Sequence, residues 1–270
     1  MSRFPFPIPY GWFHVGYCAE LSPGDVRAVR YFGRDLALWR DQDGNAHLQD
    51  AYCPHLGANI AVGGKVVGNL IECPFHKWRF TGEGRVAEID YAQRLNDKAC
   101  LPTYPVQERH GVVMAWYHPQ GVAPLYQLPD VPECSDPEFV GPFSTGHTIR
   151  TCLQEMAEAA HFATIHQHPG QAHYDDFRYY GPAMIMKSTQ KFRSSHGPVE
   201  GTLNTDTAGF GFTIVRYRTL IVICMVTTTA PVDAETSQQH NHVWYRNPAR
   251  DPKIDRIGQA FVKEVNRQFT

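Results

Sequence analysis

The sequence has 270 residues, of which 43% are hydrophobic and 19% are charged, and its formal net charge is −2. This length allows one large domain or two smaller ones, each with a core of its own. The near balance of charge argues against a nucleic-acid partner, because nucleic-acid-binding proteins usually carry a basic face. The longest apolar run, residues 220–226, is too short to cross a bilayer, and the N-terminus lacks a signal-peptide pattern. We therefore expect a cytoplasmic protein without a membrane partner.

The first part of the chain has the pattern of short strands joined by tight turns. The segment DQDGN at residues 41–45 is a hairpin signal between two such strands. A helical period is absent before about residue 150. We therefore predict an all-β domain over residues 1–122. Its predicted strands are residues 26–31, 36–40, 69–72 and 111–118.

A proline-rich connector at residues 119–142 marks a boundary, and the pattern then changes. The segment TCLQ at 151–154 fits a capping box, with Thr151 as N-cap, and an alanine-rich helix is predicted behind it at 155–166. Strands are predicted within 207–230 and at 240–246. Asp251 and Pro252 begin a last helix. Its predicted apolar stripe consists of Ile254, Ile257, Phe261, Val265 and Phe269. The second domain, residues 123–270, is thus predicted to be α+β, and so is the whole chain.

Two short motifs contain candidate metal ligands. Cys53-Pro-His55 is followed after 17 residues by Cys73-Pro-Phe-His76. The chain has 7 cysteines, an odd number that argues against a disulfide framework, and we predict that the other five are small buried residues. Neighbouring glycines are expected to let backbone amides approach the sulfurs and so tune the site. These glycines are Gly57, Gly63 and Gly64.

Two metals compete for this set of two thiolates and two imidazoles. Zinc accepts it in a tetrahedron, but usually each loop then supplies like ligands. Here each loop supplies one cysteine and one histidine. That mixture favours a 2Fe-2S cluster in which one iron takes both thiolates and the other takes both imidazoles. Zinc remains the alternative.

The chain resembles the Rieske non-haem iron oxygenases. The resemblance is carried by CPHLG, by CPFHKWRF and by FTGEGRV at residues 80–86. With AHFATIH at 160–166 and the order of elements, these motifs are most similar to 3-ketosteroid 9α-hydroxylase oxygenases and cholesterol 7-desaturases. The resemblance implies a Rieske domain followed by a helix-grip catalytic domain, and a head-to-tail homotrimer. It assigns Cys53 and Cys73 to one iron of the cluster, and His55 and His76 to the other.

The resemblance also implies a second metal, a mononuclear Fe(II). An acid-x₂-His-x₄-His segment supplies its histidines in the family, and the match here is Glu158, His161 and His166. On a straight helix, the side chains of two residues five apart point about 140° away from each other. For His161 and His166 to bind the same iron, the helix must therefore bend, bulge or end between them. Glu158 is implied to connect the cluster of one subunit with the iron of its neighbour. Most members have aspartate there, which leaves the geometry of this connection open.

The third ligand of the mononuclear iron is a carboxylate in the family. The resemblance places it just beyond Thr270, so we expect the sequence to be part of a longer chain. Internal substitutes are Glu264, Asp206 and Asp176. The pair His240 and His242 lies on one face of a predicted strand, but nothing in the sequence ties that pair to iron.

The function implied by the resemblance is that of a terminal oxygenase, an oxidoreductase of the EC 1.14 class. NAD(P)H would deliver electrons indirectly through a reductase or ferredoxin, and O₂ would hydroxylate or desaturate a hydrophobic substrate, steroid-like or polycyclic by analogy. The motifs do not distinguish a monooxygenase from a dioxygenase. The alternative is a Rieske ferredoxin-type electron carrier without oxygenase chemistry, which would need only the four cluster ligands. Four aromatic residues could line an apolar pocket, but we favour the interpretation that they belong to the core. They are Phe162, Phe210, Phe212 and Trp244.

Overall fold

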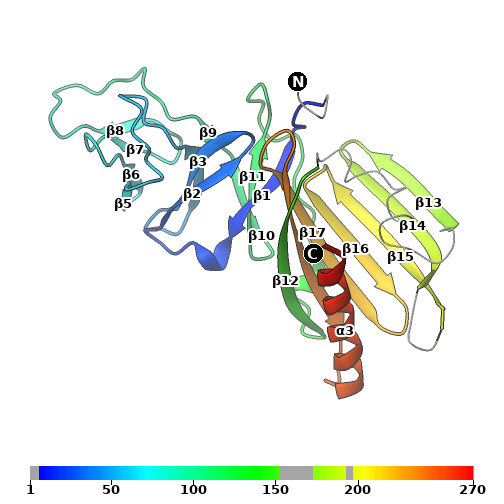
Figure 1. Ribbon diagram of the computed structural model, residues 1–270. Coiled ribbons are helices and arrows are strands. Elements are labelled where there is room, and N and C mark those ends of the chain that lie inside the picture. The colour runs from blue at the N-terminus through cyan, green and yellow to red at the C-terminus, as the bar shows by residue number, and fades with distance from the viewer. Residues whose placement is uncertain (1–5, 152–172, 193–196, 270) are drawn as a thin grey trace. The chain divides into compact units, whose positions relative to one another are not determined.

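The computed structural model describes residues 6–151, 173–192 and 197–269 (Figure 1). The chain divides into two compact units, of which the first comprises residues 1–125 and 230–235. The second comprises residues 126–229 and 236–270. In the part of the chain that the structure describes, no helix has the length and apolar character that a membrane crossing needs.

The first unit is built from strands in three small antiparallel sheets. One sheet has the order β1-β11-β10, the second β2-β3-β4-β9 and the third β5-β6-β7-β8. A short 3-10 helix, η1 (Cys18–Glu20), follows the first strand. The strands are β1 (Gly11–Tyr17), β2 (Val26–Tyr31), β3 (Arg34–Arg40), β4 (Ala46–Asp50), β5 (Lys65–Val67), β6 (Leu70–Glu72), β7 (Arg79–Phe80), β8 (Val86–Glu88), β9 (Thr103–Tyr104), β10 (Val106–Arg109) and β11 (Val112–Tyr117).

The predicted strands of this unit are confirmed to within a few residues, and so is its all-β character. The hairpin predicted at 41–45 joins β3 to β4, which pair in antiparallel register with Leu38 opposite Leu48. Asp41 organises the turn, because its carboxylate accepts hydrogen bonds from the backbone amide of Asn45 at 2.7 Å and from the Asn45 side chain at 2.9 Å. The hairpin therefore follows from local turn chemistry.

The second unit contains one seven-stranded sheet with the order β12-β18-β17-β16-β15-β14-β13. The short helix η2 (Pro132–Cys134) precedes it. The predicted strand region 207–230 separates into the end of β15, all of β16 and most of β17. The end of the predicted connector forms the start of β12, where Pro142 lies at a break in register on the edge of the sheet, a position that tolerates proline. The strands are β12 (Phe139–Ile149), β13 (His173–Tyr180), β14 (Ala183–Phe192), β15 (Val199–Ala208), β16 (Phe212–Arg218), β17 (Val222–Pro231) and β18 (Ser237–Arg246).

The predicted last helix is confirmed as α3 (Pro252–Phe269), which runs beside the large sheet (Figure 1). Asp251 caps it, because its Oδ1 accepts a hydrogen bond from the Lys253 amide at 2.8 Å. Val262 and Val265 pack on the sheet core around Tyr245. The predicted stripe is wrong at Ile257, which is 41% exposed, whereas Gly258 is buried. A Cβ at Gly258 would overlap the Tyr245 ring, so the glycine lets the helix approach the sheet closely.

Candidate metal centre

The two cysteine motifs lie in two loops of the first unit that have the same backbone hydrogen bonds. We call residues 53–58 the first ligand loop and residues 73–78 the second. The Cys53 amide donates to the Ala58 carbonyl at 2.9 Å, and the Cys73 amide donates to the Trp78 carbonyl at 2.8 Å. The repeated geometry places each cysteine at the same position of an equivalent turn.

These loops bring Cys53 and Cys73 together in a common core. Both side chains are buried, in a cluster that includes Trp39 and Ile71. The two thiols lie within hydrogen-bonding reach of each other. Burial, together with the neighbouring Cys73, raises the pKa of Cys53 to about 11. A buried thiol pair of this kind suits a positively charged metal group, which stabilises the thiolate form.

The two motif histidines also meet. The ring centroids of His55 and His76 lie 4.7 Å apart. Among the described residues, Nδ1 of His55 is buried and has no hydrogen-bond partner. A buried ring nitrogen without a partner is costly unless it binds something, and imidazole nitrogen is a good iron ligand. The four residues therefore fit a cluster that takes two sulfurs and two nitrogens.

Within the described residues, no three or more histidine, cysteine or acidic side chains are grouped to hold a single ion. A 2Fe-2S cluster does not need such a group, because each iron takes only two protein ligands and the bridging sulfides complete its coordination.

Backbone amides reach the Cys53 sulfur, but they come from residues other than the glycines. The amides of His55 and Leu56 donate to the Cys53 side chain and oppose the rise of its pKa. Those of Gly57 and Gly64 instead donate to the carbonyls of Cys53 and Ile60, at 2.9 and 3.0 Å. The amides that approach the Cys53 sulfur thus belong to His55 and Leu56, the two residues before Gly57.

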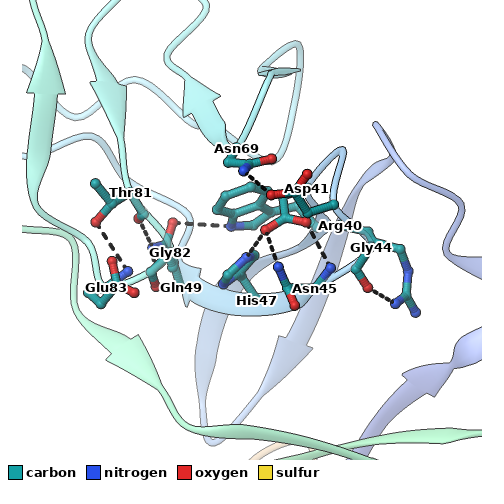
Figure 2. A network of polar contacts seen from close by, with 12 residues as sticks. Arg40, Asp41, Gly44, Asn45, His47, Gln49, Asn69, Thr81, Gly82 and Glu83 are labelled. Atoms are coloured by element: carbon teal, nitrogen blue, oxygen red, sulfur yellow. Dashed lines mark hydrogen bonds and ion pairs between the residues drawn. The ribbon is translucent and has the colours of Figure 1, made fainter.

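A polar network around Gln49 supports this core (Figure 2). The Trp39 indole, which packs in the same core as the two cysteines, donates to Gln49 at 3.2 Å. Gln49 in turn donates to the carbonyls of Thr81 and Gly82, at 2.8 and 3.0 Å. The chain that follows the second ligand loop is thus fixed to β4.

Trp78 and Tyr91 contact this site, although sequence reasoning did not single them out. The Trp78 indole stacks on the His55 ring, and its N–H donates to the Tyr91 hydroxyl. Trp78 lies two residues after His76, which is the only signal in the sequence. The contact itself joins two separate loops, so periodicity and spacing do not reveal it.

The remaining predicted cysteines and apolar side chains have mixed outcomes. Cys224 is buried as predicted, whereas Cys100 is exposed and that prediction is wrong. Cys18 and Cys134 are half-buried, and Cys152 lies outside the described residues. Phe212 and Trp244 are buried in the second unit, whereas Phe210 is exposed. Phe162 also lies outside the described residues.

The residues of the predicted second metal site, Glu158, His161 and His166, lie outside the described residues together with the predicted helix around them. The three internal carboxylates considered as third ligand each form an ion pair with arginine. Asp206 pairs with Arg216 at 2.7 Å, Asp176 with Arg178 at 2.8 Å and Glu264 with Arg267 at 2.6 Å.

His240 and His242 lie on one face of β18, as the sequence pattern predicts. His242 Nδ1 is hydrogen-bonded to the Ser144 hydroxyl at 2.9 Å. Burial, with a smaller effect of His147, lowers the pKa of His240 to about 4. His240 is therefore neutral near pH 7.

Two family matches cover most of the chain. Residues 11–105 match the Rieske [2Fe-2S] domain. Residues 115–270 match the 3-ketosteroid 9α-hydroxylase C-terminal domain. The first match contains both ligand loops, and the second extends over more than half of the sequence.

Curated relatives and solved structures agree with these matches. The chain is 41% identical over 183 residues to a cholesterol 7-desaturase of Xenopus laevis. The aligned segment covers 66% of this chain and 40% of the relative. It is 37% identical over 163 residues to a probable 3-ketosteroid-9-alpha-monooxygenase oxygenase component of Rhodococcus rhodochrous, covering 58% of this chain and 41% of the relative. The matched segments thus span about two fifths of these relatives.

Among solved structures, dicamba monooxygenase bound to dicamba has the same fold, with a TM-score of 0.72 at 16% identity, covering 96% of this chain and 85% of that one. This likeness confirms the predicted fold class. The family matches and the curated relatives confirm the resemblance. Because the Rieske domain and the C-terminal domain both match in sequence, the chain belongs to the Rieske oxygenase family, in the branch of the 3-ketosteroid 9α-hydroxylase oxygenase components and cholesterol 7-desaturases.

Proposed function

We propose that the protein is the terminal oxygenase of a multicomponent Rieske system. The observation that carries the proposal is the meeting of two buried thiols and two imidazoles from matching loops, in a chain that continues into an oxygenase C-terminal domain. Cys53 and Cys73 would hold one iron of the cluster, and His55 and His76 the other. When bound, such a cluster supplies one-electron transfer, and a mononuclear iron supplies oxygen activation.

The second part of the proposal concerns the mononuclear Fe(II). We assign His161 and His166 as two of its ligands and Glu158 as the connection to the cluster of a neighbouring subunit in a homotrimer. Support comes from the match of residues 115–270 to the C-terminal domain of the family. The third ligand is not assigned, and the domain division at residues 1–122 and 123–270 belongs to the same proposal.

The substrate class is proposed from the relatives. They are named for cholesterol and for 3-ketosteroids, so a hydrophobic steroid-like or polycyclic substrate is the first class to test. Electrons would come from NAD(P)H through a reductase or ferredoxin, since one relative is named as the oxygenase component of its system. A cytoplasmic location completes the proposal.

Iron and sulfide counts distinguish an oxygenase from an electron carrier. The full-length natural protein should bind about three irons and about two acid-labile sulfides per chain. His161→Ala should lower the iron count to about two and leave the EPR signal of the reduced cluster unchanged. His55→Ala, the matched variant, should abolish that signal. A wild-type count of two that His161→Ala leaves unchanged would favour the electron carrier and overturn the oxygenase.

The reaction is tested with ¹⁸O₂, NAD(P)H, a Rieske-type reductase and a panel of sterol, 3-ketosteroid and aromatic substrates. Hydroxylation places one labelled oxygen in the product, whereas desaturation removes two hydrogens and places none. Oxidation of a steroid by either route supports the proposed class. Failure of the whole panel, with a fully loaded and reducible protein, would contradict it.

A further inference from the structure

Trp78 contacts both ligand loops of the candidate cluster site. Its backbone carbonyl accepts the hydrogen bond of the Cys73 amide at 2.8 Å and so closes the second loop. Its indole lies on the His55 imidazole of the first loop, with ring centroids 4.5 Å apart and planes 7° from parallel. One residue therefore ties the position of a histidine in one loop to the backbone turn of the other.

The far end of the indole is also held. Its N–H donates to the Tyr91 hydroxyl at 2.7 Å. Trp78 is only 6% exposed, whereas Tyr91 is 63% exposed. Stacking sets the plane of the indole and the hydrogen bond sets its rotation within that plane. Because its one donor is used by Tyr91, Trp78 acts on the site through the His55 ring.

The two motif histidines differ in what surrounds them. The ring of His76 lies 4.0 Å from that of Phe75 and is tilted by 33°, and Phe75 is exposed. His55 instead lies flat on a buried indole, with its Nδ1 buried and without a hydrogen-bond partner among the described residues. Ligating histidines are usually oriented by a hydrogen bond at the other ring nitrogen. For His55, the stacked Trp78 indole is a further restraint on the plane of the ring.

We propose that Trp78 is a positioning residue that fixes the imidazole plane of His55 toward the cluster, and that Tyr91 locks Trp78 in place. This inference rests on the Rieske cluster of the proposed function, but not on the oxygen chemistry. The orientation of its ligands and the burial around a cluster set its electronic structure and potential. Trp78 should therefore affect spectroscopic properties of the loaded protein, independently of turnover.

Three variants separate the parts of this arrangement. Trp78→Leu removes the flat ring but keeps an apolar side chain. Trp78→Phe keeps a flat ring and lacks the N–H. Tyr91→Phe, at an exposed position, keeps its ring and lacks only the hydroxyl. The measurements are the EPR g values and midpoint potential of the reduced cluster and the rate of iron release to a chelator.

We expect Trp78→Leu to change the g values, to shift the midpoint potential and to release iron on the order of tenfold faster, as for other losses of support around metal ligands. Trp78→Phe keeps the stacked ring and loses the bond to Tyr91, so its g values should lie close to those of the wild type. Tyr91→Phe should shift the potential in the same direction as Trp78→Leu but by less, and a wild-type potential in Tyr91→Phe would overturn the locking role of Tyr91. Wild-type g values and potential in a loaded Trp78→Leu protein would overturn the proposal. If the Trp78→Leu protein does not take up the cluster, the Trp78→Phe protein provides the test of the stacking. Near wild-type g values in Trp78→Phe would then support the proposal, and strongly altered g values or failure to take up the cluster would overturn it.

Failure of this inference is distinguishable from failure of the proposed function. A wild-type protein without a reduced-cluster EPR signal would contradict the cluster and both proposals. A wild-type signal that Trp78→Leu leaves unchanged would contradict only the positioning role. A loaded cluster that responds to Trp78→Leu, in a protein that oxidises no substrate, would support the positioning role and contradict the oxygenase.

Discussion

Gly57 and Lys77 occupy the same position in the two ligand loops, and both have a left-handed backbone. Their φ angles are 75° and 60°. Each backbone amide donates to the carbonyl of the cysteine four residues earlier, at 2.9 Å for Gly57 and 3.2 Å for Lys77. Glycine adopts this conformation without steric cost, whereas a residue with a Cβ is strained in it. The second loop therefore keeps the turn at an energetic cost that the first loop avoids.

Gly57→Ala should destabilise the protein through the backbone alone. No heavy atom lies within 4 Å of the position that its Cβ would take, so no clash contributes. The left-handed conformation alone costs about 1–2 kcal/mol with a Cβ. The free energy of unfolding, measured by urea denaturation, should fall by that amount. Because Gly57 lies in the first ligand loop, the strain should also change the EPR spectrum of the cluster.

Gly68→Ala is the matched control for this prediction. Gly68 has φ 61° and also has no heavy atom within 4 Å of its Cβ position, but it lies in the turn between β5 and β6. We expect the same loss of stability without a change in the cluster EPR spectrum. Equal effects of the two variants on that spectrum would contradict a specific role of the first ligand loop.

Gly258→Ala should destabilise the second unit although alanine favours helix. The new methyl group would overlap the Tyr245 ring, and overpacking of a core costs about 1–3 kcal/mol. Helix propensity offsets at most about 1 kcal/mol of that loss. Ile257→Ala is the control, because Ile257 is exposed and such changes stay within about 0.5 kcal/mol. Thermal or urea unfolding checks both, and a larger loss for Ile257→Ala would contradict the packing described here.

Ile257 and Gly258, which are neighbours in the last helix, show what the sequence can and cannot predict. Apolar period and capping chemistry are local, so they predicted the helix, the Asp251 cap and the hairpin at 41–45. Which face of the helix is buried depends on the partner surface, and there the small Gly258 fits against Tyr245 where Ile257 would not. For the cluster site, the spacing of the two motifs predicted that the thiols of Cys53 and Cys73 and the imidazoles of His55 and His76 come together. The stacking of Trp78 on His55 is a contact between two loops, which has no periodic signal.

Glu108 should contribute a pH-dependent part of the stability. Hydrogen bonds from Arg40, at 2.5 and 3.1 Å, lower the pKa of Glu108 against the opposing effect of burial. Since the folded state binds the proton more weakly than the unfolded state, this stabilisation is complete above the ordinary glutamate pKa of about 4.3. It is lost as the pH falls through the lower pKa of the folded state.

Glu108→Gln should therefore lower the free energy of unfolding at pH 7 by about 1–2 kcal/mol, less than for a fully buried partner because Glu108 is 37% exposed. The difference from the wild type should shrink as the pH falls below about 4. Glu20→Gln is the control, because its ion pair with Arg27 is exposed and should contribute little at any pH. Urea denaturation at several pH values measures both, and a constant difference for Glu108→Gln would contradict the assigned pairing.

Asp206→Asn should leave the iron content of the full-length protein unchanged. Arg216 holds Asp206 at 2.7 Å and also contacts Glu133, at 2.5 and 3.1 Å, so the Asp206 carboxylate already has a charged partner within the sheet. We expect a loss of stability of about 0.5–1.5 kcal/mol, typical of one hydrogen bond. Glu133→Gln, which removes charge from the other side of Arg216, is the control and should behave alike. Loss of one iron per chain in Asp206→Asn alone, measured by metal analysis with an intact cluster EPR signal, would instead identify Asp206 as the third ligand of the mononuclear iron.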